Sequence, residues 1–367
     1  MQRTSSHGCE QADRGPKVMK ILYAAMMSAG SASGFRKLAL ERLGHRLVVV
    51  NTAQYMVKNR LLHKILFRVA AGPHASRLNR DLLRIAEAER PDVFWADKQL
   101  LVTPRTLKKL SAMGITTVSY MIDNPFGPRE DPGWRMYLKC LPHYDLHVQQ
   151  RDVSLAAYRK HGAKDVVKVL IGFEPTEHYP PPTPMTDKDC EREICFVGTS
   201  YDDRAATLTK LIEMGLPVTI SGPERRWRRS LSPQIMRKSF VPGDFYSKKY
   251  REAIWRSKIN LSFLTRSNED EYTQKTFEIA GCGEFMIVER CEGHTSRFKE
   301  GEEAVFFSSP EELIEKINRY LPDEETRRRI GLAGRARALR DGYDNDSQMK
   351  IILTRLEQIM TARRAGA

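Results

Sequence analysis

Cysteine is scarce in this sequence, and its spacing is irregular. The six cysteines form no CxxC pair and no rhythm of metal-ligand spacing. Neither a disulfide framework nor a zinc site is therefore expected. Scattered thiols of this kind are typical of a reducing compartment, so we expect a cytoplasmic protein.

Long hydrophobic runs are also missing. No apolar stretch approaches the roughly 18 to 20 residues that a membrane-spanning helix needs. The first 17 residues are polar and lack the apolar centre of a signal peptide. We expect residues 1–17 to form a disordered leader.

Acidic residues are too few to balance the basic ones. The 60 lysines and arginines exceed the 46 acids, which gives a formal charge of +14. Such a charge favours an anionic partner, and nucleotide diphosphate, anionic lipid and nucleic acid all have the right sign. Acids are interleaved through most of the chain, while arginines gather in short runs at 225–229 and 327–329. This distribution argues against a continuous nucleic-acid stripe.

The chain is long enough for two domains, each with its own core. Strand and helix patterns alternate in both halves, which predicts two Rossmann-like parallel sheets. A proline-rich segment predicts the linker between them. The expected parts are a first domain at 18–173, a linker at 174–193, a second domain at 194–345 and a last helix from about residue 346.

In the first half, a buried strand is expected at 20–25, and further strands are expected at 46–51, 92–96, 116–122, 146–148 and 167–171. Residues just beyond the carboxyl ends of such strands face the ligand crevice of an open sheet. Loops after three of these strands supply the candidates for an acceptor site, which are Gly30, Ser31, Asp97, Lys98, Asp123 and Asn124. The glycine-serine loop is equally consistent with a plain turn, and Asp123 with an Asn-Pro turn.

Two further patterns of the first half allow more than one interpretation. Residues 55–71 combine apolar residues at helical spacing with basic charge. They fit a helix packed on the sheet, or one that contacts an anionic membrane or acceptor. His143 and His147 are four apart, but in an extended segment they would be about 13 Å apart, too far for one metal ion.

The most informative stretch is residues 270–290. Thr273 can cap a helix that carries Lys275 and Thr276 in its first turn, and glycines at 281 and 283 end it before a strand. Free amides at a helix start attract phosphate, and Lys275 adds a full positive charge. Glu278, about one turn further on, is an acceptor that can reach a ribose diol. A surface ion pair between Glu278 and Lys275 is the alternative.

The segments FEIAGCGEFMIVE, FKEGEEAVFFSSPEELIEKINRYL and ETRRRIGLAGRARAL resemble the C-terminal half of CgeB-type glycosyltransferases, a branch of the GT-B superfamily. The resemblance implies a GT-B fold, in which two Rossmann-like domains face one another across a cleft and the last helix crosses back to the first domain. It also implies that Glu278 binds the ribose of a nucleotide-sugar donor. Many relatives carry a second acid eight positions earlier, where this chain has Asp270 with Glu271 beside it.

By the same resemblance, turns of the second domain cradle the donor. Gly198 and Thr199 would lie near the diphosphate, and Gly222, Val241 and Pro242 near the base. Arg266 would neutralise phosphate in place of a metal ion. The chain has no DxD triplet, which favours a metal-independent reaction, and Asp202 and Asp203 are interpreted as a helix cap.

The resulting prediction is a glycosyltransferase without a cofactor. It would move a sugar from a nucleotide diphosphate held by the second domain to a glycan, lipid or protein acceptor held by the first. Retention of configuration is favoured because no firm base for an inverting displacement stands out, and Asp123 is the candidate catalytic residue. A nucleotide-sugar 2-epimerase, a catalytically degenerate binding scaffold and a basic nucleic-acid carrier stay open as alternatives.

Overall fold

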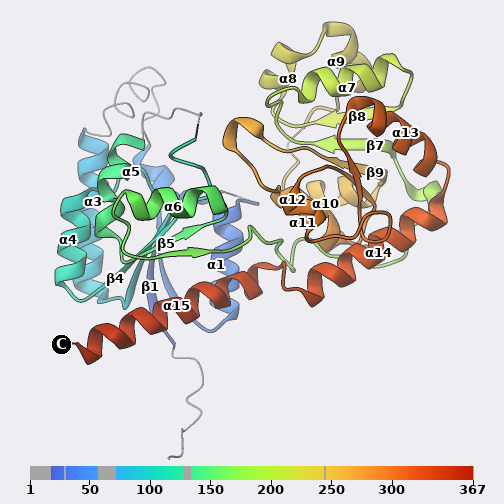
Figure 1. The fold of residues 1–367 in the computed structure, drawn as a ribbon. Coiled ribbons are helices and arrows are strands. Elements are labelled where there is room, and N and C mark those ends of the chain that lie inside the picture. Colours follow the sequence, from blue (N-terminus) through green and yellow to red (C-terminus); the bar gives the residue numbers. More distant parts are fainter. Residues whose placement is uncertain (1–17, 29, 57–71, 128–133, 244, 367) are drawn as a thin grey trace, which may run out of the picture.

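The structure, a computed structural model, describes residues 18–28, 30–56, 72–127, 134–243 and 245–366. The predicted leader at 1–17 and most of the predicted helix at 55–71 lie outside these residues. Two parallel sheets flanked by helices form two domains (Figure 1). The predicted fold class is thereby confirmed.

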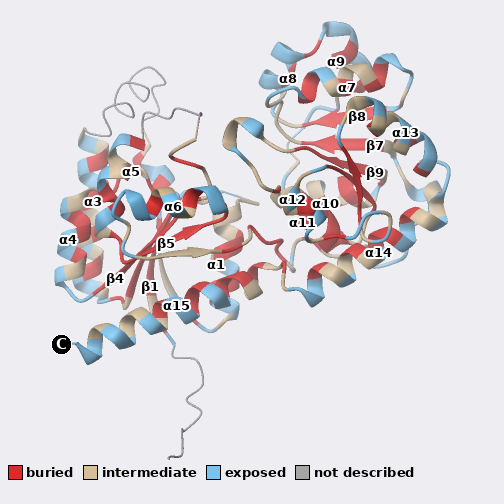
Figure 2. Ribbon diagram, in the orientation of Figure 1, coloured by how far each residue is buried: buried red, intermediate tan, exposed pale blue. Residues whose placement is uncertain are grey.

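The first domain contains a six-stranded sheet in the order β2-β1-β3-β4-β5-β6. Its strands are β1 (Lys20–Ala25), β2 (Arg46–Asn51), β3 (Val93–Asp97), β4 (Thr116–Tyr120), β5 (Leu146–Gln149) and β6 (Val166–Lys168). Its helices are α1 (Ala32–Arg42), α3 (Pro73–Glu89), α4 (Pro104–Ala112), α5 (Trp134–Cys140) and α6 (Asp152–Lys160). Every residue of β3 and β4 is buried, because helices cover both faces of a parallel sheet. Figure 2 shows the buried centre of this sheet in red.

The second domain contains a five-stranded sheet in the order β11-β10-β9-β7-β8. Its strands are β7 (Arg192–Val197), β8 (Val218–Ser221), β9 (Ser257–Ser262), β10 (Met286–Glu289) and β11 (Val305–Phe307). Its helices are α7 (Arg204–Glu213), α8 (Glu224–Ser230), α9 (Pro233–Ser239), α10 (Ser247–Trp255), α11 (Gln274–Cys282), α12 (Glu292–Thr295), α13 (Pro310–Tyr320) and α14 (Glu324–Arg340).

The last helix, α15 (Asn345–Ala365), returns to the first domain. Its buried residues Met349, Ile352 and Leu356 join the apolar cluster that contains Ile21 and Leu40. Figure 1 shows this red helix lying along the first domain, away from the sheet that precedes it. The crossing expected for a GT-B fold is thus present.

Helix α8 was not indicated by the sequence pattern. Four of its seven residues are arginines, and Trp227 is its buried residue, so it shows no apolar periodicity. Trp227 holds the helix in place because its ring packs in the core and its Nε1 donates a hydrogen bond of 2.9 Å to the Gly198 carbonyl. Tertiary packing here overrides the local pattern.

Candidate functional site

A pocket of about 370 Å³ opens beyond the carboxyl ends of β7 and β8. Gly198 follows β7 and Gly222 follows β8, and both line it. Gly222 has a φ of 146°, and a Cβ at this position would lie 2.0 Å from the Gly198 carbonyl oxygen. Because only glycine permits this approach, the two loops can come together here. Ligands of open α/β sheets bind at this edge.

Helix α11 presents Lys275 and Glu278 to the pocket. Tyr250 of α10 lies between them: its hydroxyl donates to Glu278 Oε2 at 2.7 Å and accepts from Lys275 Nζ at 3.2 Å. The Lys275 ammonium also lies 4.9 Å from the centroid of the Tyr250 ring. The alternative for Glu278 was a direct surface ion pair with Lys275. In the structure the Tyr250 hydroxyl bridges the two side chains instead.

Burial sets the charge states around Tyr250. It lowers the pKa of Lys275, an effect that the nearby Glu278 carboxylate partly opposes. It raises the pKa of Tyr250, and Glu278 raises it further. The phenol therefore stays protonated and can donate to the Glu278 carboxylate.

The start of α11 differs from the predicted cap. Thr273 occupies the N-cap position without a capping side-chain bond. Its hydroxyl is instead 2.8 Å from Ser262 Oγ and 3.1 Å from Thr276 Oγ1. Thr276 is fully buried and contacts His294 Nε2 at 3.1 Å. Thr276 was predicted as a donor-binding residue. In the structure its side chain points into the protein interior, toward His294, and does not line the pocket.

The glycine-serine loop of the first domain reaches the same pocket. Gly30 lines it and has a φ of 66°. A Cβ on Gly30 would lie 3.0 Å from Ser247 Oγ, at the start of α10 in the second domain. Ser31 does not line the pocket but caps α1, since its hydroxyl accepts from the Gly34 amide at 3.2 Å. The loop is thus both a turn and a domain contact.

Besides Thr276, three residues predicted around the donor lie outside the pocket. The exposed Arg266 pairs with the buried Glu289 at 2.6 Å and with the exposed Asp203 at 3.2 Å. The Asp203 carboxylate therefore meets Arg266 and does not cap α7, contrary to the prediction. The other two are Val241, which is exposed, and Pro242, which borders a separate hollow beside α8 and α9.

Asp97, predicted at the acceptor site, is held inside the first domain. Both of its oxygens accept from Arg36 at 2.7 Å, and Tyr23 donates to it at 2.8 Å. Only 1% of Asp97 is exposed, so this carboxylate is satisfied by the protein. Its neighbour Lys98 forms an ion pair with Asp123.

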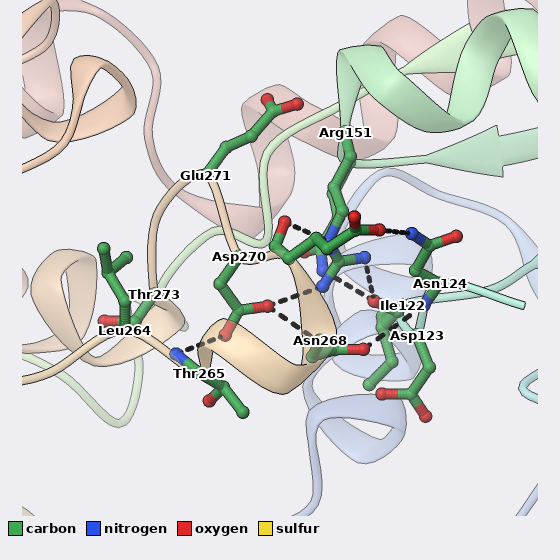
Figure 3. Close-up of polar contacts among 12 residues, drawn as sticks. Ile122, Asp123, Asn124, Arg151, Leu264, Thr265, Asn268, Asp270, Glu271 and Thr273 are labelled. Atoms are coloured by element: carbon green, nitrogen blue, oxygen red, sulfur yellow. Dashed lines mark hydrogen bonds and ion pairs between the residues drawn. The ribbon is translucent and has the colours of Figure 1, made fainter. Parts of the chain in front are cut away.

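Figure 3 shows the polar contacts of Asn124 and Asp270 between the two domains. Arg151 pairs with Asp270 at 2.6 Å and donates to the Glu269 carbonyl at 3.1 Å. Asn124 donates to the Glu269 side chain at 2.5 Å. Asp123 points away from Asp270 in this view. The cluster joins the first domain to the loop before α11, and Asp270 and Asn124 serve as contacts between domains.

A second hollow, of about 190 Å³, lies beside the linker. Ser257 and Phe285, at the amino ends of β9 and β10, line it, so it is at the wrong edge of the sheet for the predicted site. Glu284 also lines it, and burial raises the pKa of Glu284 to about 8.

The described part of the chain contains no group of three or more His, Cys, Asp or Glu residues arranged to hold a metal ion. His147 instead lies 2.9 Å from the Leu141 carbonyl, inside the first domain. None of the helices in the described ranges has the length and apolar character needed to cross a membrane.

Tyr250 and His178 are among the pocket residues that sequence reasoning missed. Tyr250 lies on a mostly polar helix, where nothing marks it as facing a ligand. His178 lies in the predicted linker, where no periodicity identifies a buried side chain. Its exposure of 2% results from packing against Phe35 and Tyr250, which belong to different domains.

Comparison with solved structures agrees with this geometry. HepE of Anabaena, in complex with UDP and glucose, is 14% identical with a TM-score of 0.60 over 93% of this chain and 100% of its own. Sucrose-phosphate synthase of Thermosynechococcus elongatus is 12% identical with a TM-score of 0.66 over 95% of this chain and 100% of its own. A glycosyltransferase of Rickettsia africae is 12% identical with a TM-score of 0.62 over 94% and 99%. The chain has the GT-B fold.

The second domain can be classified more closely. Residues 204–354 match the family described as glycosyl transferase-like. This match begins in α7 and extends into α15, so it includes α11 with Lys275 and Glu278. No curated protein matches the sequence.

Proposed function

We propose that this protein is a glycosyltransferase that uses a nucleotide-diphosphate sugar as donor. The observation that carries the proposal is the pocket at the carboxyl edge of the second sheet, where Lys275 and Glu278 lie beside Gly198 and Gly222. A cation, a carboxylate and close-approaching glycine loops suit a phosphate, a ribose diol and a nucleoside. The GT-B fold, the glycosyl transferase-like match and the UDP-glucose complex of HepE support it.

Each residue of the pocket has a chemical role in this proposal. Glu278 accepts hydrogen bonds from the ribose hydroxyls, and Tyr250 holds its carboxylate through the 2.7 Å bond. Lys275 stabilises the negative charge that develops on the leaving diphosphate. With retention of configuration, that phosphate also takes the proton of the acceptor hydroxyl.

The acceptor binds on the first-domain side of the cleft. We propose a CgeB-type enzyme that needs no metal ion or other cofactor, acts in the cytoplasm and contacts an anionic membrane at most peripherally. Asp123, which forms an ion pair with Lys98, is the candidate residue of the first domain and would bind the acceptor hydroxyl. A glycan, a lipid-linked sugar or a protein is the acceptor.

Donor binding and donor hydrolysis test the proposal together. UDP, GDP and ADP are compared by thermal shift, because a ligand that binds only the folded state stabilises it by about 2.7 kcal/mol at a hundredfold excess over its Kd. Release of UDP from a UDP-sugar without formation of a 2-epimer then identifies a transferase. Binding without hydrolysis would favour the degenerate scaffold, and UDP release with formation of a 2-epimer would favour the epimerase. If none of the three nucleotides raises the melting temperature, the pocket is not the donor site.

A further inference from the structure

His178 connects the proposed donor pocket to both domains. It lies in the segment after Phe173, between the two sheets in sequence, and its ring lines the pocket. Phe35 of the first domain contacts the ring edge-on at a centroid distance of 5.5 Å. Tyr250 of the second domain lies at 6.0 Å on the same ring. These contacts fix where the imidazole points.

The hydrogen bonds of His178 determine its tautomer. The backbone amide of Glu174 donates to His178 Nδ1 at 3.1 Å. A backbone amide can only donate, so Nδ1 must be the acceptor nitrogen of the neutral ring. The proton of the ring therefore sits on Nε2. Burial lowers the pKa of His178, which keeps the ring neutral at neutral pH.

The protonated nitrogen faces the carboxylate proposed to bind ribose. Nε2 of His178 lies 3.8 Å from Oε1 of Glu278, too far for a direct hydrogen bond. A single hydroxyl oxygen about 2.8 Å from each atom fits between them. Such a hydroxyl would donate its proton to Glu278 and accept the N–H of His178, so all three groups would be satisfied.

We propose that His178 is a donor-binding residue, whose Nε2–H donates a hydrogen bond to the same ribose hydroxyl that Glu278 accepts from. This inference rests on the proposed function and deepens it, because it specifies a ribonucleotide as donor. Removing that hydroxyl leaves the N–H of His178 and one oxygen of Glu278 without their ligand partner. The pocket thus discriminates against the corresponding deoxyribonucleotide.

Two substitutions separate the two nitrogens of the ring. His178→Gln places an amide N–H near the position of Nε2, whereas His178→Asn can retain only an acceptor near Nδ1. We expect His178→Asn to weaken UDP binding about fivefold, the usual size for one lost neutral hydrogen bond, and His178→Gln to bind within about twofold of the wild type. Calorimetry with UDP, 2′-deoxy-UDP and 3′-deoxy-UDP on the full chain measures both.

The deoxy ligands distinguish a contact to ribose from a structural role. If His178 contacts a hydroxyl, the loss in His178→Asn falls below about twofold for one of the two deoxy ligands, because that bond is already absent. An equal loss for all three ligands, or none for UDP, overturns the inference. His45→Asn is the matched control, since His45 Nδ1 also accepts a backbone amide, that of Met19 at 3.1 Å, and does not line the pocket.

Failure of the proposed function gives a different result. If wild-type protein binds none of UDP, GDP and ADP, the pocket is no nucleotide site, and both proposals fall. If GDP or ADP binds in place of UDP, the same comparison uses its own deoxy forms. Circular dichroism of each variant checks that it is folded. If His178→Asn does not fold, the UDP affinity of folded His178→Gln is the test, and a loss of more than about twofold overturns the inference.

Discussion

Glu278 has a structural partner as well as a proposed ligand. Its Oε2 accepts the 2.7 Å bond from Tyr250, and Oε1 is the oxygen nearer to His178. A carboxylate oxygen can accept more than one hydrogen bond, so the contact with Tyr250 leaves lone pairs for ribose. The contact also means that Glu278 contributes to stability, which a side chain pointing only into solvent would not.

Replacing Glu278 tests its role directly. Bonds to an ionised carboxylate contribute about 1.5 to 3 kcal/mol each, so Glu278→Ala should weaken UDP binding at least about tenfold, equivalent to 1.4 kcal/mol. Glu278→Gln should weaken it less than Glu278→Ala. Isothermal titration measures the affinity, and Glu315→Gln on the exposed face of α13 is the control. Unchanged UDP affinity in a folded Glu278→Ala variant would remove Glu278 from the site.

At the scale of elements, the loop before α1 acts through its backbone. Gly30 is in the left-handed region and lies against Ser247, whereas Gly44, with a φ of 88°, has open space where a Cβ would be. Both substitutions by alanine carry a similar backbone cost, of about 1 kcal/mol. They differ in the contact between domains.

Gly30→Ala should therefore reduce catalysis beyond its effect on stability. The added methyl pushes the loop away from Ser247 and opens the cleft on the acceptor side. We expect kcat for transfer to fall several-fold more in Gly30→Ala than in Gly44→Ala. The UDP affinity of Gly44→Ala should stay close to wild type, because Gly44 does not line the pocket. Equal transfer rates in the two variants would show that the Gly30 contact is only a turn.

Glu284, in the turn between α11 and β10, should make the free energy of unfolding depend on pH. Glu284 has a pKa of about 8 in the folded chain, against an ordinary value of 4.5. A raised carboxyl pKa contributes stability that is fully present below about pH 4.5 and is lost as pH rises through 8, by at most about 1.4 kcal/mol per pH unit. Glu284→Gln should thus be the more stable protein at about pH 9, whereas at about pH 5 most of this advantage disappears.

Urea unfolding of Glu284→Gln and wild type at both pH values measures this difference. Glu315→Gln again serves as the exposed control. If the free energies of unfolding of Glu284→Gln and wild type differ by the same amount at both pH values, the prediction is contradicted.

At the scale of the whole molecule, the domains are joined by polar contacts as well as by α15. Arg151, 1% exposed, meets Asp270, whose side chain is 11% exposed. Lys168 and the amide of Asp152 hold Glu271 at 3.2 and 2.6 Å. A pair that is this buried is costly to break from one side, because the remaining charge stays desolvated.

Arg151→Met should therefore destabilise the protein strongly, by about 3–5 kcal/mol. The double variant with Asp270→Asn should recover part of this loss, since no unpaired buried charge remains. Urea unfolding gives the free energies, and Arg159→Met on the exposed side of α6 is the control. If Arg151→Met and Arg159→Met unfold alike, the pair does not join the domains energetically.

The sequence by itself determined the local parts of this protein. Apolar runs predicted the central strands such as β3 and β4, because a parallel strand covered on both faces must be apolar. The spacing of Lys275 and Glu278 placed them one helical turn apart, and Gly283, with its φ of 76°, ends α11 as glycine at that position should. These features depend on neighbours in the chain, which periodicity records.

Only the tertiary structure decided which polar groups meet. Asp270 lies in a loop of the second domain, yet its partner Arg151 precedes it by 119 residues. Asp97 is the last residue of β3, and its carboxylate is enclosed by Arg36 and Tyr23. His178 enters the pocket because two domains close on the linker. Such pairings follow from strand order and domain packing, and no spacing along the chain encodes them.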